Sequence, residues 1–338
     1  MKARKMTVLL IASIILLLLN GCWIDPTGPA AGVASNEAVY VLNSYSSTIS
    51  VIDVEEDSVY NDVALTGKWS NHLSLYEGKL YCVNSGSNNI SIYNTADMKM
   101  EAPIDLGAGN NPMEMVIRDD IAYVTNLISA KVIKIDLATK TVIDSIDAGV
   151  GATAIALRED NIYVTNSGYD PVAYSYDPGT VSVIDINTEE TFATIPVALN
   201  PQDIAVDALG YIHVLCSGDY YSKFAKVLKI DAQSNTVIDS LCLADGNSSG
   251  VIYIDKLSGV AYCGAWNKPS LSYDTNTMDV LNNEFSFEGA SGFVTDDDGN
   301  IWISYVNLNS VYKYDEAGTI LDSAKVGMGP QSLAYIKK

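Results

Sequence analysis

Apolar and polar residues alternate in short runs along most of the chain, and these runs recur at a regular interval. An apolar–aromatic run opens each unit, as in VYVLN (39–43), AYVTN (122–126) and IYVTN (162–166). A second alternating run closes on an acid or amide at Asp53, Asn94, Asp136, Asp185, Asp231, Asp274 and Asp315, which lie 41 to 49 residues apart. Alternation with a period of two is typical of half-buried strands. The sequence therefore predicts seven copies of one small β unit.

Each unit contains two further strand-like runs, for example TVIDSIDA (141–148) and AIALR (154–158). Four strands in roughly 40–45 residues is the period of a propeller blade. The first unit lacks an inner strand, whereas the chain ends with a spare one, SLAYI (332–336). We predict an all-β, seven-bladed β-propeller of four-stranded antiparallel blades. The C-terminal strand should complete the first blade, because closure removes the open sheet edges of a linear array.

The first 37 residues follow a different pattern. Three cationic residues precede an apolar run (7–19) that is too short for a good transmembrane span, as in a secretion signal. The ending Leu19-Asn20-Gly21-Cys22 resembles the lipobox of bacterial lipoproteins, which implies lipidation of Cys22 and anchoring to a membrane. An ordinary signal peptide with a nearby cysteine is the alternative. We expect a signal peptide (1–21), the lipidated cysteine with a flexible tether (22–37), and the propeller (38–338).

The blade pattern also divides the loops between two faces. With strands A to D counted from the axis outward, A–B and C–D turns lie on one face, which we call the turn face. B–C loops and the D–A links between blades lie on the other, which we call the link face. Turn-face segments are short and acidic, such as VEEDS (54–58) and TDDDGN (295–300). The second also resembles a calcium loop, but calcium needs further ligands, so we interpret it as a tight turn.

The link face carries the aromatic and amide residues that suit a binding site. Both loop tryptophans of the propeller fall there, and the B–C loops of blades four and five are extended (166–180 and 217–225). Aromatic surfaces with a few amides hold amphipathic, largely uncharged ligands. The alternative is that the long loop packs its own tyrosines over a blade edge. The predicted ligand-binding residues are Trp69, Asn111, Tyr169, Tyr174, Tyr176, Gln202, Tyr220, Tyr221, Trp266 and Gln331, with Phe224 beside them.

Charge and chemistry favour a binding protein over an enzyme. A net charge of −21 argues against a nucleic-acid partner. The chain has 2 histidines, His72 and His213, without metal-ligand spacing, and it lacks a phosphate loop and a nucleophile elbow. We therefore expect no catalytic residue, metal or cofactor. The four cysteines after Cys22, which are Cys82, Cys216, Cys242 and Cys263, are expected to be buried free thiols.

The repeat motif also resembles a known family. AYVTN and IYVTNSG, followed by VSVIDINTEETFATIPVALNPQDIAV, are similar to YVTN-repeat, YncE-like seven-bladed propellers over nearly all of residues 38–338. Together with the lipobox, they resemble the BtuG-type surface lipoproteins of gut Bacteroidetes. That resemblance implies a lipid-anchored outer-membrane protein at the cell surface that captures cobalamin for a TonB-dependent transporter. The alternatives are an envelope scaffold that docks a partner and, less favoured, a lactonase-type enzyme.

Overall fold

The structure is a computed structural model that describes residues 35–219, 224–243, 250–282 and 285–338. The predictions for the signal peptide, for Cys22, for most of the tether and for Tyr220 and Tyr221 lie outside these residues.

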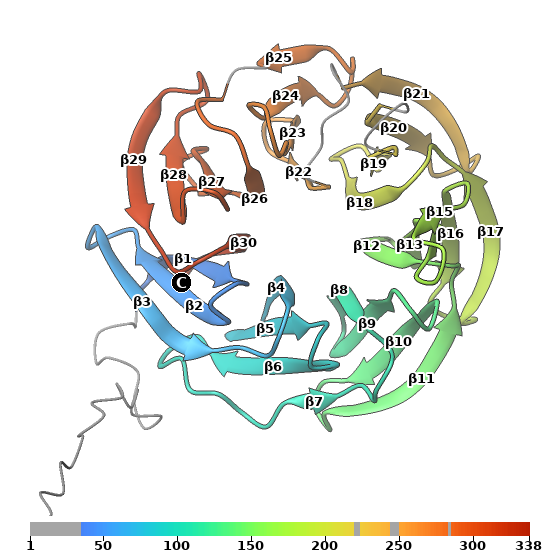
Figure 1. Ribbon diagram of the computed structural model, residues 1–338, viewed down its shortest axis with the longest axis horizontal. Coiled ribbons are helices and arrows are strands. Elements are labelled where there is room, and N and C mark those ends of the chain that lie inside the picture. Colours follow the sequence, from blue (N-terminus) through green and yellow to red (C-terminus); the bar gives the residue numbers. More distant parts are fainter. Residues whose placement is uncertain (1–34, 220–223, 244–249, 283–284) are drawn as a thin grey trace, which may run out of the picture.

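The chain forms seven four-stranded antiparallel sheets in a ring, as Figure 1 shows. From the axis outward, blade 1 contains β30 (Pro330–Lys337), β1 (Glu37–Asn43), β2 (Thr48–Asp53) and β3 (Ser58–Leu65); blade 2 contains β4 (Ser70–Tyr76), β5 (Lys79–Asn84), β6 (Asn89–Asn94) and β7 (Ile104–Asp105); blade 3 contains β8 (Pro112–Arg118), β9 (Ile121–Asn126), β10 (Lys131–Asp136) and β11 (Thr141–Asp147). Blade 4 contains β12 (Ala152–Arg158), β13 (Asn161–Asn166), β16 (Thr180–Asp185) and β17 (Glu190–Pro196); blade 5 contains β18 (Pro201–Val206), β19 (Ile212–Cys216), β20 (Lys226–Asp231) and β21 (Thr236–Cys242). Blade 6 contains β22 (Ile252–Asp255), β23 (Val260–Cys263), β24 (Leu271–Asp274) and β25 (Val280–Asn282); blade 7 contains β26 (Ala290–Thr295), β27 (Ile301–Tyr305), β28 (Ser310–Tyr314) and β29 (Ile320–Lys325).

The predicted seven-bladed, all-β fold is confirmed. The middle strands of each blade are buried on both faces, as β13 is, because neighbouring blades cover them. Outer strands such as β11 face solvent along most of their length. Among the described residues the chain forms no helix, and therefore none long and apolar enough to cross a membrane.

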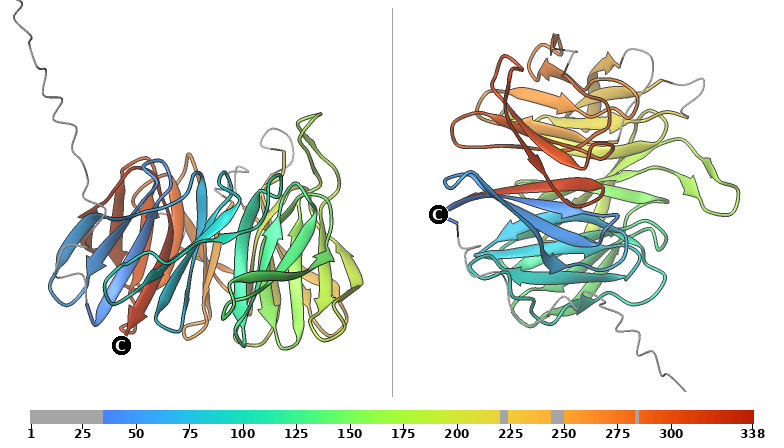
Figure 2. Two further views of the ribbon diagram at one scale, coloured as in Figure 1. Left: turned by 90° about the horizontal axis from the view of Figure 1, so that it is seen from below. Right: turned by 60° about the vertical axis from the view of Figure 1, so that its left-hand side comes forward.

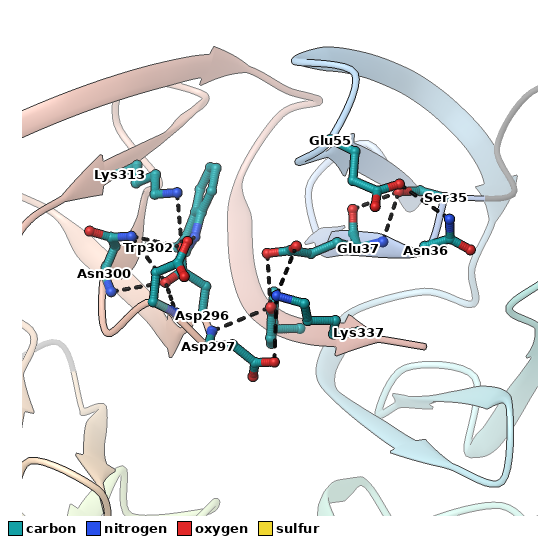
Figure 3. A network of polar contacts seen from close by, with 12 residues as sticks. Ser35, Asn36, Glu37, Glu55, Asp296, Asp297, Asn300, Trp302, Lys313 and Lys337 are labelled. Atoms are coloured by element: carbon teal, nitrogen blue, oxygen red, sulfur yellow. Dashed lines mark hydrogen bonds and ion pairs between the residues drawn. The ribbon is translucent and has the colours of Figure 1, made fainter.

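The predicted closure is also confirmed. β30 pairs antiparallel with β1, placing Val41 opposite Leu333. At the turn-face end, Tyr335 donates a hydrogen bond to the Glu37 carboxylate (2.9 Å) and accepts one from the Asp297 amide (3.3 Å), and Lys337 pairs with Glu37 at 3.3 Å (Figure 3). The start of β1, the end of β30 and the adjoining turn of blade 7 are thus held together by one polar network.

Polar side chains on the inner strands join each blade to the next. Within the ring the bonds are Ser332 to Leu73 N–H (3.2 Å), Ser74 to the Met115 carbonyl (3.3 Å), Glu114 to Ile155 N–H (3.3 Å), Thr153 to the Pro201 carbonyl (3.1 Å), Asp203 to Ile252 N–H (2.8 Å), Tyr253 to Thr295 N–H (3.1 Å) and Ser291 to the Pro330 carbonyl (2.6 Å). All seven seams carry such a bond. The inner strand is the edge of each sheet and has no further strand to pair with on its axial side. Each of these bonds gives a partner to a backbone group of such a strand.

Three further sequence predictions concern the TDDDGN segment, metal ligands and the cysteines. The TDDDGN segment is a turn in which Asp296 accepts bonds from the Asp298 and Asn300 amides (Figure 3). No group of acids, histidines and cysteines suited to a metal occurs among the described residues. The four cysteines at 82, 216, 242 and 263 are free, but Cys242 is exposed, contrary to expectation. It ends an outer strand, which no further blade layer covers.

Candidate functional site at the link face

In each of the seven links between blades, a residue one or two positions before the inner strand has the left-handed backbone conformation. These residues are Trp69, Asn111, Gly151, Asn200, Gly250, Gly289 and Gly329, with φ between 52° and 85°. The link carbonyl then accepts a bond from the adjoining B–C loop, as Trp69 does from Ser85 N–H (3.0 Å). Glycine and asparagine adopt this conformation readily, whereas a tryptophan there is strained by about 1–2 kcal/mol. Trp69 is therefore the exception among the seven.

Behind the links, the inner strands surround a cavity on the propeller axis. In six blades the pairing register shifts between the inner strand and its neighbour near the link-face end, for example between Ser70 and His72. Such bulges turn an additional side chain away from the sheet. The cavity measures about 510 Å³, and the polar residues that line it are Asn71, His72, Glu114, Thr153, Gln202, Asp203, Lys256, Ser291, Gln331 and Ser332.

Two carboxylic acids and a histidine on the cavity wall have shifted pKa values, chiefly because of burial. Burial, then the nearby Asp203 carboxylate, raise the pKa of Glu114 well above its usual value. Burial raises the pKa of Asp203 to about 7, against the opposing effect of N–H bonds from Ile252 and Ile204. Burial also lowers the pKa of His72 to about 4, and its Nδ1 lies 3.8 Å from Glu114. Burial therefore favours the uncharged forms of Glu114 and His72.

Exposed apolar residues surround the cavity on the same face. In described link-face loops the large exposed ones are Tyr45, Trp69, Ile128, Val150, Val172, Tyr174, Phe224 and Met328. In the described turn-face connections they are Met100, Leu209 and Leu257. Turn-face segments instead expose acids, including Glu55, Glu56, Asp119, Asp120, Glu159 and Asp160. The two faces thus differ in chemistry as well as in loop length.

The long loop of blade 4 folds as a hairpin, β14 (Tyr169–Asp170) with β15 (Ser175–Tyr176), that projects from the link face beside the ring (Figures 1 and 2). The rings of Tyr169 and Tyr176 lie 5.5 Å apart and are half-buried, so these two tyrosines pack within the loop. Val172 and Tyr174, at the tip, are 86% and 81% exposed. One tyrosine pair therefore holds the loop together, and a third tyrosine, Tyr174, faces outward.

The structure brings only some of the predicted residues together. Gln202 and Gln331 line the axial cavity. Trp69, exposed, and Trp266, half-buried, lie in loops around it on blades 2 and 6. Asn111 is a link residue whose backbone N–H bonds to Asn88 at 2.9 Å, and it does not line the cavity.

The cavity acids Glu114 and Asp203 and the exposed Tyr45 were not predicted. A signal existed for the acids, because each lies three positions after the asparagine of its link, in NPME (111–114) and NPQD (200–203). The alternation of apolar residues alone does not reveal which of these side chains face the axis.

Comparisons with known proteins support the fold. No family model and no curated protein matches the chain. Hydrazine synthase of Kuenenia stuttgartiensis is 15% identical with a TM-score of 0.67, covering 80% of this chain and 95% of that chain. A quinoprotein alcohol dehydrogenase-like protein of Bacteroides thetaiotaomicron is 15% identical with a TM-score of 0.62, covering 89% of this chain and 78% of that chain. A functionally unknown protein of Desulfotomaculum acetoxidans is 11% identical with a TM-score of 0.68, covering 88% of this chain and 98% of that chain. At these identities the likeness shows the fold alone.

Proposed function

We propose that this propeller is a binding protein that captures a large, amphipathic and largely uncharged ligand on its link face. The observation that carries the proposal is the contrast between the faces: the link face exposes aromatic and aliphatic side chains around an axial cavity, whereas the turn face exposes acids. Ligand sites combine apolar walls with a few polar groups that fix orientation. Gln202 and Gln331 provide amides, and burial raises the pKa of both wall acids, Glu114 and Asp203.

Cobalamin is the specific ligand that we propose. It presents an extended apolar ring system with amide side chains at its edge, and so it matches aromatic loops around a cavity wall that carries amides. The surface-lipoprotein resemblance of the sequence points to the same ligand and to a TonB-dependent transporter as the partner that receives it.

Anchoring through Cys22 would orient this face. The described chain enters the propeller at Glu37, which pairs with Lys337 at the turn-face end of blade 1. A lipid-anchored tether would therefore meet the turn face or its edge, and the link face would point away from the membrane. We accordingly propose that the protein lies at the outer membrane with the link face open to its ligand.

Partner docking is the second candidate function, because the blade-4 hairpin presents exposed Val172 and Tyr174 beyond the ring (Figure 2). Exposed apolar groups at a projecting tip are also suited to contact another protein. A hairpin variant that binds the small ligand normally but loses the transporter would favour this role for the tip.

The proposal is tested by titrating the purified propeller with cyanocobalamin, with haem and neutral oligosaccharides as competing probes. In one variant the blade-4 loop (167–179) is replaced by the short blade-2 loop SGSN (85–88). We expect that variant to bind cyanocobalamin at least tenfold more weakly, a loss of about 1.4 kcal/mol. The matched control replaces the exposed turn-face residues Leu209 and Leu257 by alanine and should bind as the native chain does. Equal affinity of loop variant and native chain, or a loss confined to the control, would refute the proposed site.

A further inference from the structure

Trp69 is the least expected residue among the seven links. The other six links place glycine or asparagine in the left-handed position, and blade 2 places a large aromatic residue there at φ 52°. Burial of the side chain does not offset this strain, since Trp69 is 71% exposed. Strained residues that the surrounding structure holds in place cluster at functional sites. The question is therefore what the exposed indole contacts.

The surrounding backbone fixes the indole as a platform. One side of the ring rests on the B–C loop of blade 2, where a Cβ atom on Gly86 would come within 2.8 Å of Trp69 Cε3. The loop is tied to the link by Ser85 N–H and Oγ to the Trp69 carbonyl and by Gly86 N–H to the Lys68 carbonyl. One side of the indole ring thus lies against Gly86, which we call glycine-backed, and most of the side chain is open to solvent.

A second aromatic residue lies on the adjoining blade. Tyr45, in the B–C loop of blade 1, is 67% exposed, and its ring lies over Gly329 of the preceding link, where an added Cβ would come within 2.5 Å. The same loop bonds to the link that carries Trp69, through Thr66 N–H to the Ser47 carbonyl (2.9 Å). Two glycine-backed aromatic residues therefore stand on neighbouring loops of blades 1 and 2.

The B–C loops beside the two rings carry neutral groups, and exposed Lys68, next to Trp69, is the one cation of the link. The two B–C loops read SYSST (44–48) and SGSNN (85–89), so they present hydroxyl and amide groups. An apolar ligand needs enclosure, which an open platform does not give. A sugar ring, in contrast, can cover an indole with its C–H face while its hydroxyl groups stay hydrated or bond to serine and asparagine. We infer that Trp69 and Tyr45 form a subsite for a neutral saccharide.

This inference rests on the proposed function only in taking the link face as the binding face. The subsite lies on blades 1 and 2, separate from the blade-4 hairpin that the cobalamin proposal needs. The two proposals can therefore fail independently.

The test is native electrophoresis in gels that contain a soluble neutral polysaccharide: a mixed-linkage β-glucan, a xylan or a galactomannan. We expect at least one of them to retard the native protein. Trp69→Asn should weaken that retardation at least tenfold, and Tyr45→Ala should weaken it as well. Because asparagine occupies the same link position at Asn111 and Asn200, Trp69→Asn should leave the melting temperature unchanged or higher. Tyr174→Ala, on the hairpin, is the control and should leave retardation unchanged.

Three results would overturn the saccharide subsite: no retardation of the native protein by any of these polysaccharides, full retardation of both the Trp69→Asn and Tyr45→Ala variants, or loss of retardation in the Tyr174→Ala control alone. The variant in which the blade-4 loop (167–179) is shortened tests whether the two sites are separate. If it loses cyanocobalamin binding and is still retarded by the polysaccharide, the two sites are separate. Failure of cyanocobalamin to bind would refute the proposed ligand and leave the polysaccharide result to be judged by itself.

Discussion

Replacing Asp296 by asparagine tests how the turn before β27 stabilises blade 7. The Asp296 side chain is fully buried, and its two oxygens accept bonds from the Asp298 and Asn300 amides (3.1 and 2.9 Å), from Trp302 Nε1 (3.1 Å) and from Lys313 Nζ (2.9 Å), as Figure 3 shows. Burial opposes ionisation of this carboxyl. The bonds from Lys313, Asn300 and Trp302 outweigh that effect and hold the pKa of Asp296 below its usual 3.8.

The expected loss follows from the number of donors. The asparagine side chain offers one oxygen and one NH₂ group. Whichever way the amide is turned, the NH₂ group would replace one of the two carboxylate oxygens and would face the N–H donors that this oxygen now accepts. A hydrogen bond to a charged group contributes about 1.5–3 kcal/mol, and an orphaned buried donor adds a further penalty. We therefore expect Asp296→Asn to lower the free energy of unfolding by about 3 kcal/mol and the melting temperature by roughly 5–10 °C.

Urea unfolding followed by circular dichroism measures this loss at pH 7. The control is Asp297→Asn, whose exposed carboxylate lies 3.7 Å from Lys337 and should contribute under about 1 kcal/mol. Because the folded-state pKa of Asp296 is depressed, its contribution is present above about pH 4 and is lost as the pH falls through the folded-state value. The difference between native protein and variant should therefore shrink in acid. Equal stability at pH 7, or a difference that stays constant into strong acid, would refute the argument.

Three further outcomes are expected. Deleting β30 with Lys338 should lower the melting temperature by more than 10 °C, because it removes buried pairing with β1 and exposes the inner edge of β1; unchanged melting in a thermal scan would contradict the closure. Glu114→Gln should raise stability to urea at pH 8 and leave it unaltered at pH 4, since a raised carboxyl pKa destabilises the fold only where the unfolded chain ionises; the opposite order would exclude a buried, neutral Glu114. Cys22→Ala should move the protein from membrane to soluble fractions, and unaltered fractionation would show that another element anchors it.

The fold could be predicted from the sequence because each blade repeats one local pattern. Period-two alternation identified the strands, and the missing inner strand before VYVLN (39–43) together with the spare SLAYI (332–336) predicted the closure. The division of loops between two faces followed from antiparallel order alone. These are consequences of strand geometry, which the sequence expresses directly.

The site could be predicted only in part, because ring closure brings together residues far apart in the chain. His72, Glu114 and Asp203 share one cavity although 131 residues separate the first from the last. Their inward orientation depends on bulges, which the alternation pattern does not specify. The strain at Trp69 was in principle visible, since aligned links place Asn or Gly at that position. That comparison needs the link boundaries, which only the structure fixes to the residue.

Hydrogen–deuterium exchange with saturating cyanocobalamin tests the central claim, ligand capture on the link face, most directly. Bound ligand should slow exchange in link-face peptides covering residues 168–178, 200–203 and 330–332. Exchange in the turn-face peptides 54–58 and 255–259 should not change. Slowed exchange confined to the turn face, or none on the link face at saturation, would contradict the account.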